Sequence, residues 1–239
     1  MKISSNLEII NLSLWLEKEK TLIISDIHIG YEEYLQQKGV MLPKLQTKEI
    51  IQQLKTIFKK VQPQKIIING DLKHEFGKVL QQEWKDVLKL IDFLQQHCQE
   101  LILVKGNHDV ILGPIASKRN LTVVNDYKIE DILIVHGDKL PDKTTAKTII
   151  IGHEHPSVTI RDKQKYERYK CFLKGKWKNS ELIVMPSFNP LLEGTDLVKE
   201  ELLSPFLTNI SNFEVFVSSK GEIFQFGKVK TILQYTSPL

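Results

Sequence analysis

The sequence predicts one α/β domain, spanning residues 1–239, in which two mixed sheets pack face to face with helices on their outer sides. In the first half, apolar strand-like runs alternate with helical periodicities, an order that favours parallel strands joined by right-handed crossovers. In the second half, short strand candidates follow each other closely, which is typical of largely antiparallel pairing. No internal repeat, low-complexity tract or linker divides the chain, so we expect a single domain.

The first elements are a hairpin and a helix. Residues 12–16 and 21–25 are apolar arms around the polar segment 17–20, which predicts two adjacent strands. Apolar residues then recur at helical spacing between 47 and 61, and Pro63 stops this helix because proline lacks a backbone N–H donor.

The next three elements complete a strand–helix–strand–helix–strand series. Residues 66–68 form a short isoleucine run, typical of a strand buried on both faces. A second helix places apolar side chains on one face between 84 and 94, and it leads into the strand at 101–104.

The second half is predicted to contain seven strands, two tight turns and a short helix. The turns are expected at Asn179–Ser180 and at 219–221, and the helix at 197–207, ended by Pro205. The strand candidates are residues 132–135, 148–151, 158–160, 171–177, 182–185, 213–217 and 223–226.

Histidine, aspartate and asparagine residues recur at the ends of the strand candidates. Because the carboxyl ends of parallel strands meet at one edge of a sheet, we expect these side chains to gather there. A single Asp-X-His or Gly-Asn-His is a weak signal, but several such clusters in one chain are a much stronger one. They comprise Asp26, His28, Asp71, His74, Asn107, His108, His136, His153 and His155.

Composition is that of a globular protein, with 41% hydrophobic and 26% charged residues. No apolar run approaches the roughly 18 residues needed to cross a bilayer, and the first residues lack the pattern of a signal peptide, so we expect a cytoplasmic protein without membrane association. Cys98 and Cys171 are expected to be buried, unreactive thiols. The sequence does not fix an oligomeric state, and a homodimer is compatible with it.

One segment is strongly basic although the formal net charge is only +4. Arg161 to Lys178 contains eight Lys or Arg against two acidic residues, a local excess of six. Aromatic residues interleaved with these charges are typical of a surface that binds DNA or RNA. An exposed edge strand whose lysines are solvated has the same composition, so both interpretations stay open.

The order of the clusters resembles the signature of the calcineurin-like metallophosphoesterases, and the surrounding residues resemble the small ICC-like, SbcD-related prokaryotic members. The matching residues are Asp26-X-His28, Gly70-Asp71, Gly106-Asn107-His108-Asp109, His136 and Gly152-His153-X-His155, with Ser187 to Gly194 as a further matching word. The resemblance implies a four-layer αββα sandwich.

The resemblance also implies two metal ions and a catalytic histidine. Asp26, His28 and His155 would hold one metal, and Asp71 would bridge it to the other. The second metal would be held by Asn107, His136 and His153, with His108 as the catalytic residue outside the metals. Such oxygen and nitrogen ligands suit manganese, which we expect, as well as iron or zinc.

The chain departs from the family pattern next to the bridging aspartate. Many members carry an aspartate and an arginine three and four residues after it, where this chain has His74 and Glu75. Lys73 is a candidate for supplying positive charge to the substrate, and His74 for orienting His108 or contacting the phosphate. Asp109 and Asp138 either orient a histidine ring or cap a turn.

These observations predict a metal-dependent phosphoesterase, more specifically a phosphodiesterase, in which a hydroxide activated by two metals attacks phosphorus. Nucleic acid is a candidate substrate because of the resemblance and the basic segment. Two alternatives remain, namely an enzyme for small nucleotides and a metal-binding scaffold protein with weak or no turnover.

Overall fold

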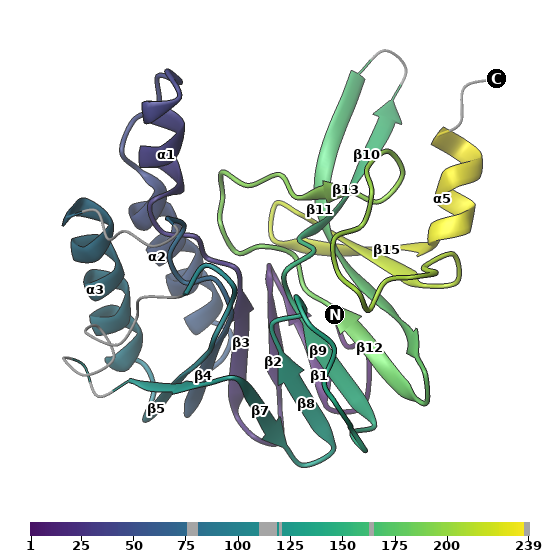
Figure 1. Cartoon of the computed structure of the whole chain (residues 1–239), viewed down its shortest axis with the longest axis horizontal. Helices are drawn as coiled ribbons and strands as arrows, with labels where there is room; N and C mark the ends of the chain where they lie inside the picture. The colour runs from purple at the N-terminus through teal and green to yellow at the C-terminus, as the bar shows by residue number, and fades with distance from the viewer. Residues whose placement is uncertain (76–80, 110–118, 120, 163–164, 237–239) are drawn as a thin grey trace.

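The computed structural model describes residues 1–75, 81–109, 119, 121–162 and 165–236. It consists of two mixed sheets that face each other, as the sequence predicts (Figure 1). In the first sheet β1, β2 and β3 are antiparallel neighbours, and β3 to β6 are parallel. Its strands lie in sequence order: β1 (Leu7–Ile10), β2 (Ser13–Leu16), β3 (Thr21–Ser25), β4 (Lys65–Asn69), β5 (Glu100–Val104) and β6 (Thr122–Val124).

The second sheet is less antiparallel than expected. Its order is β13-β10-β11-β12-β9-β8-β7, with β14 pairing β11 and β15 pairing β14. Strand β9 pairs in parallel with both β8 and β12, because the chain leaves the sheet between these strands instead of making a tight turn. The strands are β7 (Asp126–Ile129), β8 (Ile132–Val135), β9 (Thr148–Ile151), β10 (Pro156–Asp162), β11 (Lys165–Trp177), β12 (Ser180–Val184), β13 (Thr195–Asp196), β14 (Glu214–Ser219) and β15 (Glu222–Lys228).

The two predicted helices are present on the outer face of the first sheet: α2 (Gln46–Phe58) and α3 (Gln81–Gln95) (Figure 1). Within the described residues, two further helices were not anticipated: α1 (Tyr31–Gln37) directly after β3 and α5 (Val229–Thr236) near the C-terminus. No helix in the described part of the chain has both the length and the apolar character to cross a membrane.

Alternating side chains of the central strands explain how the layers hold together. Ile23 and Ile67 point between the sheets and share a core with Ile134 and Ile150 of the second sheet. Their neighbours, such as Ile68, point the other way and pack against α2 and α3. Both faces of these strands are therefore buried, which accounts for their continuous apolar runs.

Residues 197–207 are not helical, contrary to expectation. They run as turns and irregular chain across the outer face of the second sheet, where Leu197, Phe206 and Leu207 join the core. The Glu154 carboxylate accepts the backbone N–H groups of Leu203 and Ser204, both at 2.8 Å. Their peptide groups are thus paired outside a helix, so the apolar spacing reflects packing on the sheet.

The two hairpins predicted in the second half of the chain form, with one shift. Strands β14 and β15 are joined by residues 220–221, as expected. Strands β11 and β12 are joined by Lys178–Asn179, one residue earlier than predicted, because Trp177 pairs with Ser180. Ser180 is held in the ladder by its hydroxyl, which donates to the carbonyl of Ala146 at 2.7 Å.

Candidate metal centre

The predicted site residues meet at one rim that is formed by both sheets. They lie in the loops that follow the carboxyl ends of β3, β4, β5, β8 and β9. Each of these loops contributes one of the clusters seen in the sequence. The two sheets are joined just below the rim, where the Asn69 side-chain amide donates to the Val135 carbonyl at 3.0 Å. Parallel strands in both sheets thus bring residues distant in sequence to one place.

The first predicted ligand set converges. Nε2 of His155 lies 3.4 Å from Oδ1 of Asp26 and 3.4 Å from Nε2 of His28. Asp26 and His28 are buried, whereas His155 is half-buried. The three residues offer their oxygen and nitrogen atoms to a common point, as a divalent cation requires.

The second predicted set converges in the same way. Nε2 of His136 lies 2.8 Å from Oδ1 of Asn107 and 3.2 Å from Nδ1 of His153. Together with Asp71, His136 and His153 form a second group whose candidate ligand atoms lie within 4.8 Å of one another.

Asp71 stands between the two sets. Its Oδ2 lies 3.6 Å from Nε2 of His28 in the first set and 3.5 Å from Nε2 of His136 in the second. A carboxylate at this position can neutralise a cation on either side. The structure therefore places Asp71 where the family resemblance puts the bridge.

Two observations fit the donor set to two cations. Ligand atoms bound to one metal at about 2.1 Å are separated by roughly 3.0–3.4 Å, close to the spacings in both sets. Oδ1 of Asp26 and Nδ1 of His136 are buried and have no hydrogen-bond partner in the described structure. Buried groups in this state are costly, and a cation would compensate the charge of Asp26.

The backbone of the site is strained in a pattern that the sequence did not reveal. Five of the seven predicted ligands have left-handed backbone angles, with φ of 52° at Asp26, 47° at His28, 40° at Asp71, 63° at His153 and 49° at His155. Such conformations cost about 1 kcal/mol or more each in residues with side chains. Their concentration here indicates that the fold holds these side chains in position at the expense of local stability.

Two glycines allow the loops to approach each other. A Cβ atom at Gly70, whose φ is +81°, would lie 1.9 Å from Nδ1 of His136. A Cβ atom at Gly106 would lie 2.1 Å from Oδ1 of Asp71. Side chains at either position would displace a predicted ligand, which explains why glycine precedes these clusters.

Electrostatics of the metal-free site also favour cation binding. Burial lowers the pKa of His28, and it lowers the pKa of His136 to about 4, so both rings are neutral, the form that binds metals. Burial and the charge of Asp26 raise the pKa of Asp71. Burial opposes ionisation of Asp26 as well, but the neighbouring imidazoles, His155 first, lower its pKa overall. Asp26 and Asp71 can therefore both be ionised at neutral pH when a positive charge lies beside them.

His108 lies beside the two sets, and its Nε2 is 3.9 Å from Oδ2 of Asp71. Its Nδ1 donates to the backbone carbonyl of His74 at 2.5 Å, which directs Nε2 toward the site. Burial lowers the pKa of His108, while this hydrogen bond opposes the shift. The orientation of His108 is thus set by the backbone of His74.

The His74 ring contacts the first ligand set. Its Nδ1 lies 3.4 Å from Nδ1 of His28, the nitrogen of that ring facing away from the other ligands. Burial and the proximity of His108 and Lys73 lower the pKa of His74 to about 4, so its ring is neutral. His74 occupies the position of the family aspartate and contacts both His28 and His108.

The other charged candidates near Asp71 make contacts with the surrounding protein. Lys73 is fully buried, and its ammonium donates to the carbonyl of Glu75. Asp109 caps a turn, because its carboxylate accepts the N–H of Leu72 at 3.0 Å and that of Gly106 at 3.1 Å. Asp138 lies 3.8 Å from the Lys139 ammonium.

A supporting network beneath the first set was not anticipated. The Ser187 hydroxyl donates to the backbone carbonyl of Asp26 at 2.7 Å. The side-chain amide of Asn189 donates to the backbone carbonyl of His28 at 3.3 Å. Gln46 donates to the same His28 carbonyl at 2.8 Å. The ammonium of Lys170 donates to the carbonyls of Ser187 and Asn189. The sequence match at Ser187 to Gly194 drew attention to Ser187 and Asn189. Their role in supporting the ligands depends on hydrogen bonds to residues distant in sequence, which the sequence does not reveal.

Much of the basic segment is occupied by internal contacts. Lys170 is half-buried and its ammonium donates to the carbonyls of Ser187 and Asn189, and Arg168 pairs with Glu200 at 2.8 Å. Phe172 is fully buried, and Trp177 packs on Phe206 with ring centroids 4.9 Å apart. These residues do not form the continuous basic and aromatic surface that one interpretation of the sequence required.

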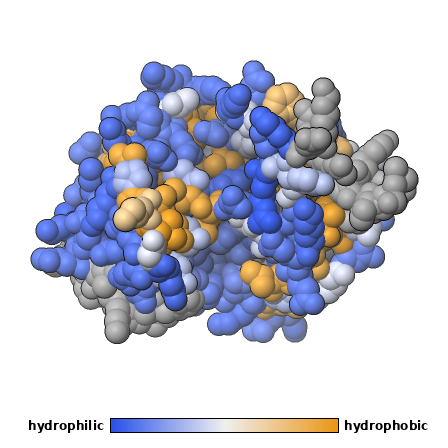
Figure 2. Space-filling model, turned by 90° about the horizontal axis from the view of Figure 1, so that it is seen from above, coloured by the Kyte–Doolittle hydropathy of each residue, from blue (hydrophilic) through white to orange (hydrophobic). Residues whose placement is uncertain are grey.

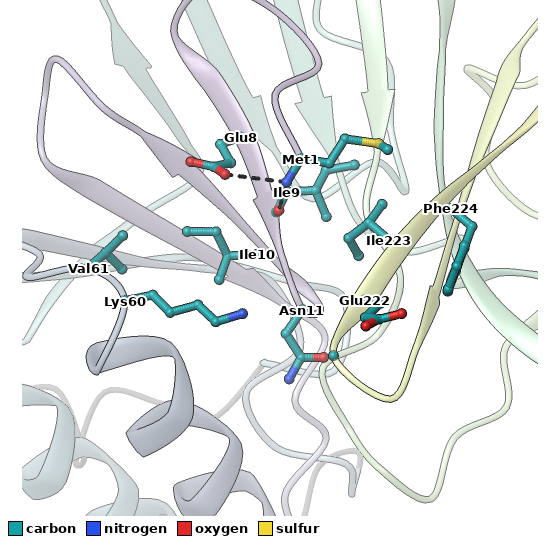
Figure 3. A pocket seen from close by; sticks show the side chains of 11 residues that line it. Met1, Glu8, Ile9, Ile10, Asn11, Lys60, Val61, Glu222, Ile223 and Phe224 are labelled. Carbon is teal, nitrogen blue, oxygen red and sulfur yellow. Dashed lines mark hydrogen bonds and ion pairs between the residues drawn. The ribbon is translucent and has the colours of Figure 1, made fainter.

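The rim is open to solvent beside the second ligand set. A cavity of about 720 Å³ is lined by Asn107 and His136 together with Lys105, Lys139 and Lys143. Seen from above, the rim is mostly hydrophilic and hollowed near its middle (Figure 2). A cavity of about 490 Å³ between β1 and β15 is lined by none of the candidate ligands (Figure 3).

Comparison with known proteins agrees with this geometry. A model of the calcineurin-like phosphoesterase family matches residues 19–219. No curated protein matches the chain significantly. Nuclease MPE from Pseudomonas putida has a similar structure, with a TM-score of 0.64 and 17% identity over 90% of this chain and 91% of that one. Yfce, a phosphoesterase from E. coli, gives a TM-score of 0.43 and 15% identity over 87% of this chain and 98% of that one.

The family model covers most of the chain, and its match agrees with the order, spacing and convergence of the His and Asp clusters. The likeness to nuclease MPE, at 17% identity, independently shows the two-sheet fold. The chain belongs to the calcineurin-like phosphoesterase family.

Proposed function

We propose that the protein is a phosphodiesterase that uses two divalent cations, and that it belongs to the ICC-like, SbcD-related group. The observation that carries this proposal is the position of Oδ2 of Asp71. This atom lies 3.6 Å from one ligand set, 3.5 Å from the other and 3.9 Å from Nε2 of His108. Binding groups and a proton-carrying group are thus arranged around one point.

When bound, the cations supply Lewis acidity that activates water and neutralises charge on the phosphate oxygens. Asp26, His28 and His155 would hold one cation, and Asn107, His136 and His153 the other, with Asp71 shared. We propose manganese, because carboxylate, amide and imidazole ligands without sulfur suit it.

His108 is the proposed catalytic residue. Because its Nδ1 proton is donated to the His74 carbonyl, its Nε2 is the atom that faces a bound phosphoester. Burial lowers the pKa of His108, and the negative charge of a bound phosphate acts in the opposite direction. A proton held at Nε2 would then pass to the leaving oxygen, whose departure completes the hydrolysis.

Nucleic acid is the substrate class that we propose. The cavity beside Asn107 and His136 carries Lys105, Lys139 and Lys143, which can neutralise phosphates next to the one being cleaved. The fold is that of a nuclease from Pseudomonas putida, which supports the proposal by analogy. Small nucleotides would use the same metal centre without needing the lysines.

The proposal is tested by hydrolysis of a nitrophenyl phosphodiester and the matching monoester, with metal-stripped protein and added manganese. We expect manganese-dependent cleavage of the diester. In His108→Ala, manganese-dependent cleavage of a dinucleoside phosphate, whose alkoxide leaving group needs a proton, should fall about 100-fold or more. Metal content of this variant, measured in parallel, should stay at the wild-type level. Tight metal binding without cleavage of either ester would contradict the enzyme and favour a metal-binding scaffold protein.

A further inference from the structure

We infer that Tyr31 and Tyr34 of α1 form a stacking subsite for an unpaired nucleobase on the leaving group of the substrate. This inference rests on the proposed phosphodiesterase function. It adds a specificity site that is separate from the metal ligands. The subsite comprises the two tyrosine rings and the exposed side of the His74 ring that they contact.

The three rings form one continuous aromatic surface. The Tyr31 and Tyr34 rings are nearly parallel, with centroids 6.0 Å apart and an interplanar angle of 22°. Each meets the His74 ring edge-on, with centroids 4.9 Å apart. Both tyrosines are half-buried, so part of each ring is accessible. Rings of this kind stack bases largely independently of sequence, because every base has a π face.

This surface adjoins His108, the residue proposed to give a proton to the leaving oxygen. The His74 and His108 rings are stacked, with centroids 5.4 Å apart and an interplanar angle of 24°. Since His108 gives its proton to the leaving oxygen in the proposed reaction, the group attached to that oxygen passes next to His74. The tyrosines are the next aromatic residues beyond His74, because both of their rings contact the His74 ring.

Helix α1 is fixed relative to the metal ligands, as a specificity site requires. The buried carboxylate of Glu32 accepts the N–H groups of Leu45 and Gln46, both at 2.9 Å. The Gln46 side chain in turn accepts the N–H of Gly30 at 3.1 Å and donates to the His28 carbonyl at 2.8 Å. The tyrosines therefore keep their position relative to His28 without a substrate.

The surroundings of α1 suit a nucleic-acid strand. The Lys38 ammonium lies 5.6 Å from the Tyr34 ring centroid and can neutralise a phosphate beside a stacked base. Val40, Met41 and Leu45 are exposed beyond the helix, Met41 by 99%. A hydrophobic patch is visible on this side of the hollow in Figure 2. The aromatic and apolar surface can contact the face of a base, and the neighbouring positive charge can neutralise the phosphate attached to that nucleoside.

The test compares three dinucleoside phosphates: one with both bases, and two in which one base is replaced by hydrogen. The cleavage products identify the leaving side. In the wild type, loss of the leaving-side base should lower kcat/KM by about 5- to 100-fold. In Tyr34→Leu and Tyr31→Leu this loss should be no more than about twofold, whereas Tyr34→Phe should behave like the wild type.

Metal content and cleavage of the base-free leaving group should be unchanged in these variants, which separates stacking from a structural role. Equal base dependence in the wild type and both leucine variants would overturn the subsite. Cleavage of the nitrophenyl diester without cleavage of any dinucleoside phosphate would also overturn it while leaving the phosphodiesterase intact. Failure to cleave any diester would instead contradict the proposed function, and the subsite with it.

Discussion

At the residue scale, His74 connects the first ligand set to the proposed catalytic histidine. Its ring nitrogen faces Nδ1 of His28 at 3.4 Å, and its backbone carbonyl accepts the Nδ1 proton of His108. Ligand histidines commonly depend on a partner at their second nitrogen, which fixes the ring and its tautomer. A neutral imidazole at position 74 can accept the Nδ1 proton of His28, which leaves Nε2 of His28 to bind a cation.

The change His74→Phe tests this partnership. It keeps an aromatic ring and the backbone carbonyl, so the contact to His108 should persist, but it removes the acceptor for His28. We expect metal affinity to fall by about 10- to 100-fold, measured by titration of metal-stripped protein. His74→Gln, which restores a polar side chain, is the matched control. Unchanged affinity in the phenylalanine variant would show that His28 does not depend on His74.

Lys170 predicts a distinct pH dependence of stability. Burial lowers its pKa to about 7, from 10.5 in an exposed lysine. The unfolded chain therefore binds more protons between these values, so stability contributed by this residue rises with pH across that window and is lost as pH falls through about 7.

The measurement compares unfolding of metal-stripped wild type and Lys170→Met in denaturant between about pH 6.5 and 10. The stability of the wild type relative to the variant should increase with pH, by up to about 1.4 kcal/mol per unit. Lys165→Met, at an exposed position of the same strand, should show no such trend. A difference that stays constant or decreases with pH would mean that Lys170 is charged in the folded protein.

At the element scale, patterns that depend on neighbours in sequence were predictable, and those that depend on distant partners were not. Helices α2 and α3 and strands β3, β4 and β5 formed where the apolar periodicity placed them. The parallel pairing of β9 was missed because strand partners are not encoded locally. Lysine normally marks surface, so the inward contacts of the Lys170 ammonium with the Ser187 and Asn189 carbonyls were not predictable either.

The segment 197–207 was misjudged for a related reason. Its apolar spacing is helical, but Glu154 accepts two of its backbone N–H groups and Pro205 interrupts it. Glu154→Ala should therefore lower the free energy of unfolding by about 2 kcal/mol, measured in denaturant. Glu154→Gln keeps an oxygen acceptor and should lose less than half as much. If both substitutions cost the same, the carboxylate is not what holds this segment.

At the scale of the whole molecule, the metal centre needs both sheets. Asp26 and Asp71 come from the first sheet, whereas His136 and His153 come from the second, and the core between the sheets sets their separation. Sequence order suggested this convergence through strand ends at one rim, but the distances among the ligands and their left-handed backbone angles required the folded chain.

A shared core predicts that the chain unfolds as one unit, as expected of a single domain over residues 1–239. Trp15 reports on the first sheet and Trp177 on the second. Two variants, each retaining one of these tryptophans as the only one, should show coincident transitions by fluorescence and circular dichroism. Separate midpoints for the two sheets would instead indicate two independently folding units.

The most direct test of the metal centre is a crystal structure of the manganese-loaded protein, with anomalous scattering used to locate the metal. We expect two peaks, one among Asp26, His28 and His155 and the other among Asn107, His136 and His153, with the Asp71 carboxylate between them. Two such peaks would establish the dinuclear centre. A single peak, or manganese bound elsewhere on the molecule, would contradict it.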